Sequence, residues 1–203
     1  MTSKIRPALI LASTSPSRRK LLKNAGLSFS SIRPHVDERA VEAPYRLLGA
    51  RPEFLAGLLA REKALDVSRR VRDAVVIGGD QVMAFQGKPY SKPESRTQAA
   101  EHLRLLSGKS HFLYSALAIA RDGEILFETM EPATIRLRNL QENEIEAYLA
   151  GLSDEVLFSS GLYQLEGTGV RLFDRVEGDY FTILGLPMLP LLAGLRQLDC
   201  IDG

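Results

Sequence analysis

The chain has 203 residues, 45% of them hydrophobic, which is enough to bury a full core in one large domain or two closely joined lobes. Its 26 Lys and Arg residues balance 25 Asp and Glu residues, and the net charge of +1 gives no global attraction to nucleic acid or an anionic membrane. Cys200 is the only cysteine, which excludes an internal disulfide and a cysteine-based zinc site. The first apolar run, Ala8 to Ala12, is too short for a signal-peptide core or a membrane span, so we expect a soluble, cytoplasmic protein.

The N-terminal third predicts a strand followed by helices. Ala8 to Ala12 is typical of a buried strand. Ser15 before Pro16 predicts the start of a helix, because Ser is a good N-cap and Pro suits the first helical position. Leucines at helical spacing from Pro44 to Arg70 predict either one long helix broken at Pro52 or two short helices.

The middle of the chain predicts a strand that ends in polar residues. The β-branched run Val75 to Ile77 is followed by Gly78-Gly79-Asp80, which indicates a strand with its chemistry at one end. Ser95 has capping-box spacing and predicts a helix that stops near Ser107.

The rest of the chain continues this alternation, which favours an α/β fold without internal repeats. Asp122-Gly123 predicts a hairpin turn between two strands. The remaining predicted elements are strands at His111 to Ala120, Ile125 to Glu128 and Thr134 to Leu137, and helices at Glu142 to Leu149 and Leu189 to Leu198.

The segment from Ser13 to Arg19 is a candidate phosphate site. A helix start combines free backbone N–H groups with hydroxyls and two guanidinium groups, which together favour an anion. An ordinary capped helix with solvated basic residues explains the segment equally well at this point.

Several acidic and basic residues are candidates for chemistry. Asp80, beside two glycines, could hold a divalent cation or accept a proton from water, although an Asp ending a strand is often only a turn former. The pair Asp37-Glu38 is expected in a loop, where acidic residues are usually just solvated. A third group of candidates consists of Lys63, Lys88 and Lys92. Most lysines are simply exposed on the surface, and that alternative applies to these three as well.

Other catalytic patterns are missing from the sequence. His111 has no second His or Cys at ligand spacing, which favours a structural role for it over a metal role. The sequence has no Gly-x-Ser-x-Gly elbow, and its glycine-rich segment from Gly161 to Gly169 is neither a P-loop nor a dinucleotide fingerprint.

Taken in order, the motifs resemble those of the Maf family of nucleotide pyrophosphatases, from Leu9 to about Leu195. The matching motifs are LASTSPSRRKLL, VDER, EKA, GGDQV, YSKP, LSGKSH, the arginine of LRNL, SGLYQLEGTG and EGDYFTILGLP. The resemblance implies an α/β fold of the Maf/inosine-triphosphatase type, with a long mixed sheet, flanking helices and a central nucleotide-binding cleft. It implies one domain over residues 1–203 with two lobes around the cleft, a homodimer, and a divalent cation such as Mg²⁺, Mn²⁺ or Co²⁺.

By this resemblance the protein hydrolyses a nucleoside triphosphate to the monophosphate and pyrophosphate. Asp80 matches the catalytic carboxylate, Glu38 the acidic residue of the loop, and Lys63 and Lys92 the lysines of the cleft; Asp80 and Glu38 would also hold the metal. Lys88 does not match. The other residues on motif positions are Ser13, Ser15 and Arg18, as substrate-binding residues, and His111 and Arg138.

Three positions bear on the base. The branch of the family that acts on dTTP and UTP has Arg, Thr and Gln where this chain has Ser17, Gln81 and Glu166. Gln81 and Glu166 resemble the branch that acts on 7-methyl-GTP, although that branch typically has Trp at the position of Ser17. A buried Glu166 could accept hydrogen bonds from the N1–H and amino groups of guanine, which thymine and uracil do not offer as a pair.

Two alternatives remain from the sequence. One is a pyrophosphatase that prefers dTTP or UTP. The other is a non-catalytic nucleotide-binding regulator of cell division, which could keep Arg18 and lose the groups that activate water. The presence of Asp80, Glu38 and Lys63 favours the enzyme.

Overall fold

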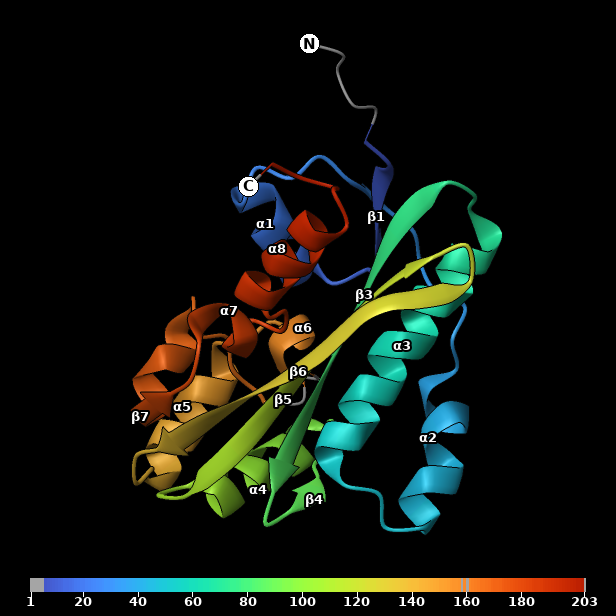
Figure 1. Ribbon diagram of the computed structural model, residues 1–203. Helices are drawn as coiled ribbons and strands as arrows, with labels where there is room; N and C mark the ends of the chain where they lie inside the picture. Colours follow the sequence, from blue (N-terminus) through green and yellow to red (C-terminus); the bar gives the residue numbers. More distant parts are fainter. Residues whose placement is uncertain (1–5, 158, 160, 203) are drawn as a thin grey trace.

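A computed structural model describes residues 6–157, 159 and 161–202 of the chain. Its central feature is a seven-stranded mixed sheet in the order β2-β1-β3-β5-β6-β7, with β4 paired to β3 (Figure 1). The strands are β1 (Ala8–Ala12), β2 (Ser30–Ser31), β3 (Ala74–Phe85), β4 (Lys88–Pro89), β5 (Ser110–Arg121), β6 (Glu124–Leu137) and β7 (Phe173–Glu177). Strand β1 runs parallel to β2 and β3, and the other pairs are antiparallel. The predicted α/β class with a long mixed sheet is confirmed.

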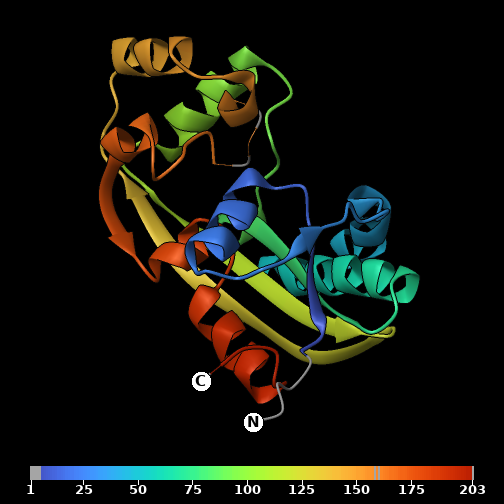
Figure 2. The same ribbon diagram turned by 90° about the horizontal axis from the view of Figure 1, so that it is seen from above.

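Helices cover both faces of this sheet. They are α1 (Pro16–Asn24), α2 (Glu38–Leu47), α3 (Pro52–Arg70), α4 (Arg96–Leu106), α5 (Glu142–Ala150), α6 (Asp154–Leu157), α7 (Tyr180–Ile183) and α8 (Met188–Gln197), with a 3₁₀ turn at Thr168–Leu172. Helices α3 and α8 lie on opposite sides of the curved sheet (Figure 2). Ala60 and Ala64 of α3 pack against the alanines of β5, whereas Leu191 and Leu195 of α8 pack against Ile77 and its neighbours.

The sheet leaves one open edge. Strand β1 pairs with Ala74–Gly78 of β3, and β4 pairs only with Ala84 and Phe85. Among the described residues, the stretch from Gly79 to Met83 therefore has no neighbouring strand on that side. A cavity lined by Asp80, Gln81 and Met83, among others, opens there.

Strand β3 differs from its prediction. It continues without a register shift through Gly78-Gly79-Asp80, so Asp80 lies in the middle of a strand and not at its end. A glycine is needed at position 78 because α3 lies so close: a Cβ there would be 2.8 Å from the Cβ of Ala64 and closer still to the carbonyl oxygen of Ala60. The glycines therefore allow a close approach of helix to strand, and do not mark a turn.

Strand β6 was predicted as two strands, and it is one. Pro132 lies inside it, opposite Tyr114 of β5. Strand β7 pairs with β6 only from Thr134 onward, so Pro132 lies where the other side of β6 has no partner strand among the described residues. A proline is tolerated there because its missing N–H interrupts no ladder.

The helical prediction is confirmed as two helices, but the first begins earlier than expected. The carboxylate of Asp37 accepts a hydrogen bond from Ala40 N at 3.1 Å and caps α2, so Glu38 is the first helical residue and the expected loop there is wrong. Pro44 lies inside α2 and does not start a helix. No residue of α2 is buried.

The other predicted elements are confirmed within one or two residues, including the turn at Asp122 and Gly123, whose φ values are both positive (50° and 86°). The sequence missed only short elements: β2, β4, α6, the 3₁₀ turn, β7 and α7. None of the described helices is both long and apolar enough to cross a membrane.

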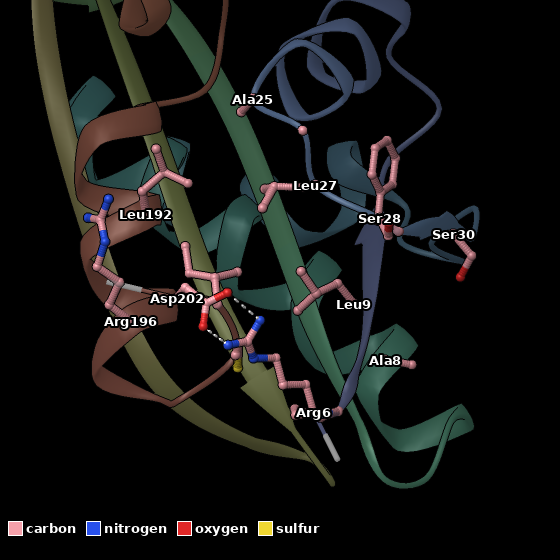
Figure 3. A pocket seen from close by; sticks show the side chains of 15 residues that line it. Arg6, Ala8, Leu9, Ala25, Leu27, Ser28, Ser30, Leu192, Arg196 and Asp202 are labelled. Atoms are coloured by element: carbon pink, nitrogen blue, oxygen red, sulfur yellow. Dashed lines mark hydrogen bonds and ion pairs between the residues drawn. The ribbon is translucent and has the colours of Figure 1, made fainter. Parts of the chain in front are cut away.

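The two ends of the described chain meet. The guanidinium of Arg6 pairs with the carboxylate of Asp202, with Nη1 at 3.0 Å from Oδ2 (Figure 3). A cavity of about 800 Å³ lies beside this pair, and the side chains of Leu9, Leu27 and Leu192 line it.

Candidate active site

A cavity of about 1300 Å³ opens at the free edge of β3. Its walls come from the turn between β1 and α1, from α2 and α3, and from the segment around residues 159–166. Every residue predicted for the site lines it: Ser13, Ser15, Ser17, Arg18, Glu38, Lys63, Asp80, Gln81, Lys92 and Glu166. The fold therefore brings together residues that lie up to 153 positions apart in the chain, as Ser13 and Glu166 do.

Lys63 stands at the centre of the cavity wall between two carboxylates. Its Nζ lies 2.6 Å from Oδ1 of Asp80 and 2.5 Å from Oε1 of Glu38. Lys63 is only 6% exposed and Asp80 7%, so each charge depends on the other for compensation. The close approach of α3 to Gly78 places Lys63 beside Asp80.

Glu38 is half exposed and is held in its charged form. Partial burial raises the pKa of its carboxyl group, but the charge and hydrogen bond of Lys63 outweigh burial, with help from Lys92 and Arg18. The net pKa is below its usual value, so Glu38 is an anion at neutral pH. Lys92 is exposed and lines the same cavity.

The phosphate corner has the expected helix cap. Ser15 Oγ accepts a hydrogen bond from Arg18 N at 3.4 Å, and Ser13 Oγ accepts one from Ser15 N at 3.1 Å. Arg18 Nε donates to the carbonyl of Gly185 at 2.8 Å, which fixes the guanidinium against the cavity. Burial lowers the pKa of Arg18, and the negative charges of Asp80 and Glu38 oppose this.

Gln81 follows Asp80 in β3, so its side chain points to the other face of the strand, where hydrogen bonds hold it in place. Its Nε2 donates to Ser115 Oγ at 2.8 Å and to the carbonyls of Thr182 and Ile183 at 3.1 Å each. The amide therefore offers only its oxygen to a ligand, as an acceptor.

Glu166 differs from expectation. It was predicted to be buried, but its side chain is 34% exposed and its Oε1 lies 2.8 Å from Nζ of Lys20. It lies between α6 and the 3₁₀ turn, outside the described strands and helices, and it lines the cavity. A neighbouring lysine, not burial, sets the environment of this carboxylate.

A profile of Maf-like proteins matches residues 8–198. The chain belongs to the Maf family. It is 51% identical to a 7-methyl-GTP pyrophosphatase of Rhizobium etli over 197 residues, covering 97% of this chain and 99% of that protein. It is 52% identical to a 7-methyl-GTP pyrophosphatase of Rhizobium johnstonii, with the same coverage. It is also 53% identical to a nucleoside triphosphate pyrophosphatase of Nitrobacter hamburgensis over 189 residues, or 93% of each chain.

Two residues on Maf motif positions lie outside the cavity lining. His111 is fully buried, and its Nε2 lies 2.5 Å from the hydroxyl of Tyr163, which does line the cavity. Burial lowers the pKa of His111 to about 4, so the ring is neutral. Arg138 donates from Nη1 to Glu144 at 2.8 Å and from Nε to the carbonyl of Arg171 at 2.8 Å. Both residues connect segments of the fold.

Lys88, which does not match the Maf motifs, lies on β4 outside the lining. Ser160, the first residue of the SGLYQLEGTG motif, lies outside the described residues.

Sequence reasoning missed several charged residues of the cavity. They are Lys20, Arg33, Arg39, Glu42, Glu94 and Arg46. The position of Lys20 two residues after Arg18 was a usable signal, since both lie in the first turns of α1. The position of Arg33 had no comparable signal, because it precedes α2 in a segment without regular structure.

The chemistry of the cavity fits a divalent cation. No group of three or more His, Cys, Asp or Glu side chains suited to a metal occurs among the described residues. Mg²⁺, however, is usually held by one or two carboxylates together with substrate phosphates, and not by a complete protein cage. Glu38 and Asp80, which converge on one Nζ, are two such carboxylates.

Proposed function

We propose that this Maf-family protein hydrolyses 7-methyl-GTP to 7-methyl-GMP and pyrophosphate. The protein is an enzyme, a nucleoside triphosphate pyrophosphatase, as its near-complete match to relatives of that name indicates. The observation that carries the proposal for the reaction is the position of Lys63 between Glu38 and Asp80 inside a cavity that also holds the phosphate corner.

Asp80 is placed to activate water. Its Oδ1 is occupied by Lys63, and no described residue donates to its Oδ2, which is therefore available to a water molecule. Asp80 orients this water and takes its proton as the oxygen attacks the α-phosphorus in line. A new P–O bond forms, the bond from the α-phosphorus to the bridging oxygen breaks, and pyrophosphate leaves.

The other residues position the triphosphate. Arg18, Lys92 and the N-terminus of α1 supply positive charge to the phosphate oxygens. Lys63 pairs with Asp80 and holds its carboxylate in one orientation. Glu38 and Asp80 would hold Mg²⁺, Mn²⁺ or Co²⁺, which when bound supplies neutralisation of the charge on the leaving pyrophosphate.

Two other polar side chains of the cavity, Gln81 and Glu166, suit a guanine base. The oxygen of Gln81 and the carboxylate of Glu166 are two acceptors for the N1–H and amino group of the base. A methylated guanine carries a positive charge, which a carboxylate attracts. Ser17 lines the same cavity and offers no ring for stacking, so the preference rests on hydrogen bonds and charge.

The test is a panel of triphosphates assayed for pyrophosphate release with Mg²⁺ or Mn²⁺. We expect 7-methyl-GTP to have the highest kcat/KM, ahead of GTP, dTTP and UTP. A clear preference for dTTP or UTP would establish the pyrimidine alternative and contradict the roles of Gln81 and Glu166. Release from none of them, with nucleotide still bound, would favour the non-catalytic regulator. The homodimer and the cytoplasmic location belong to the same proposal, and sedimentation of the purified protein tests the dimer.

A further inference from the structure

The central lysine cannot neutralise a triphosphate by itself. Lys63 carries one positive charge and already faces the two negative charges of Glu38 and Asp80. Two other cations of the cavity are also paired: Lys20 with Glu166 at 2.8 Å and Arg46 with Glu42 at 2.7 Å. A nucleoside triphosphate brings about four further negative charges. The cavity must therefore use cations that have no carboxylate partner.

Arg33 and Arg39 are two such cations. Both line the cavity and are exposed, and neither guanidinium has a hydrogen bond or ion pair with any residue that the structure describes. Arg39 follows Glu38 in the first turn of α2, and Arg33 lies in the segment that leads into this helix. Their charges face open space in the cavity.

The backbone that carries Arg33 is fixed even though its side chain is free. Asp66 and Arg70, one turn apart on α3, form an ion pair at 2.7 Å. Arg70 Nη2 donates to the carbonyl of Arg33 at 3.0 Å, and Asp66 Oδ2 accepts from His35 N at 2.8 Å. This clamp anchors the segment before α2 to α3, so little ordering is needed when a ligand binds its side chains.

The position of α2 indicates which phosphates it meets. Helix α2 lies beside α3, whereas α6 lies on the other side of β3 (Figure 1), and Glu166 and the residues of α2 line the same cavity from different segments of the chain. If Glu166 contacts the base and Asp80 the α-phosphorus, the chain of phosphates continues toward α2. This step rests on the proposed function.

We propose that Arg33 and Arg39 bind the β- and γ-phosphates of the substrate and hold them as the departing pyrophosphate. Guanidinium groups suit this task, because their planar donors pair with phosphate oxygens two at a time. The two arginines thus form a second phosphate-binding wall, opposite the corner at Ser13 to Arg19.

The test is calorimetric titration of the protein with inorganic pyrophosphate and, separately, with 7-methyl-GMP, both in the presence of Mg²⁺. We expect Arg33→Ala and Arg39→Ala each to weaken pyrophosphate binding roughly ten-fold or more and to leave 7-methyl-GMP binding unchanged. Arg39→Lys keeps the charge without the fork and should recover part of the loss. The control is Arg72→Ala, because Arg72 is also exposed and unpaired among the described residues but lies outside the cavity.

The outcomes separate this inference from the proposed function. Unchanged pyrophosphate affinity in both variants, or a wild-type protein that does not bind pyrophosphate, would overturn it. An equal loss for 7-methyl-GMP would overturn the assignment to the terminal phosphates. If the wild type binds pyrophosphate through these arginines but hydrolyses no 7-methyl-GTP, the inference stands and the proposed substrate is wrong. Unfolding temperatures near that of the wild type confirm that each variant is folded.

Discussion

Two cavities of this molecule differ in where their charges lie. The cavity at the chain ends is lined by apolar and small polar residues and by three charged ones, and its ion pair is exposed: the side chain of Arg6 is 42% accessible and that of Asp202 86%. In the cavity at the edge of β3, Lys63 and Asp80 are almost completely buried and still face open space. The burial of its charges, together with its larger volume, therefore distinguishes the candidate active site from the cavity at the chain ends.

The physical difference is the dielectric environment of the charges. An exposed ion pair is screened by water and contributes little to stability. A buried charge interacts far more strongly with its neighbours, so a ligand that enters beside it changes the energy of the whole group. The position of Lys63 between Glu38 and Asp80 is suited to chemistry for this reason, and the pair Arg6–Asp202 is not.

The largest expected effect comes from the buried carboxylate. Asp80→Asn keeps an oxygen acceptor for Lys63 but removes the base, so kcat should fall roughly 100-fold or more while the fold is retained. Steady-state pyrophosphate release measures the rate, and circular dichroism controls for the fold. Turnover near that of the wild type would exclude Asp80 as the base.

The sequence predicts those features of the fold that depend on neighbouring residues. The helix cap at Ser15 and the turn at Asp122 follow from residue types a few positions apart, and both are confirmed. The family, the α/β class and the enzyme class were predicted from the order of motifs and are confirmed.

Predictions from the sequence were wrong where contacts between residues far apart in the chain determine the structure. Glycines normally interrupt a strand, and only the approach of α3 explains why β3 continues through Gly78. Glu38 was expected in a loop, because its contact with Lys63 spans 25 positions and leaves no local pattern. The burial of Glu166 was predicted wrongly for the same reason, since its partner Lys20 lies 146 residues away. The roles of the site residues remain predictions that the variants test.

His111 tests the effect of burial on a second ionisable group, next to Tyr163, which lines the cavity at the edge of β3. Its pKa is lowered to about 4 in the folded protein, against about 6.5 when unfolded, so the unfolded chain binds the extra proton between these values. This contribution to stability is therefore present above pH 6.5 and is lost as the pH falls toward 4. We therefore expect the free energy of unfolding to fall by about 2 kcal/mol from this residue alone when the pH is lowered from 7 to 5.

Urea unfolding of the wild type and of His111→Gln at the two pH values measures this contribution. The variant should be less stable at pH 7, and its stability should change less with pH than that of the wild type. An identical pH dependence in the two proteins would mean that His111 is not buried as a neutral ring.

The ion pair of Lys20 with Glu166 tests how a neighbouring charge affects the proposed contact of Glu166 with the base. Glu166→Gln removes the negative charge and should lower the preference for 7-methyl-GTP over GTP about ten-fold, because only the methylated base is cationic. Lys20→Met keeps the carboxylate and removes its partner, and should raise the same preference. The ratio of the two kcat/KM values is the measurement, and it is insensitive to a general loss of activity. No change in the ratio for either variant would place the base elsewhere in the cavity.

The smallest effect is expected at the chain ends. Arg6→Ala breaks the exposed pair with Asp202, and it should change the unfolding temperature by no more than about 2 °C and leave kcat/KM for 7-methyl-GTP unchanged. Scanning calorimetry and the pyrophosphate assay measure the two quantities. A marked loss of activity would show that the cavity drawn in Figure 3 communicates with the edge of β3. Two elements connect the cavities, because β1 runs from Ala8 to Ala12 and α1 runs from Pro16 to its C-cap at Ala25, and each has one end at each cavity.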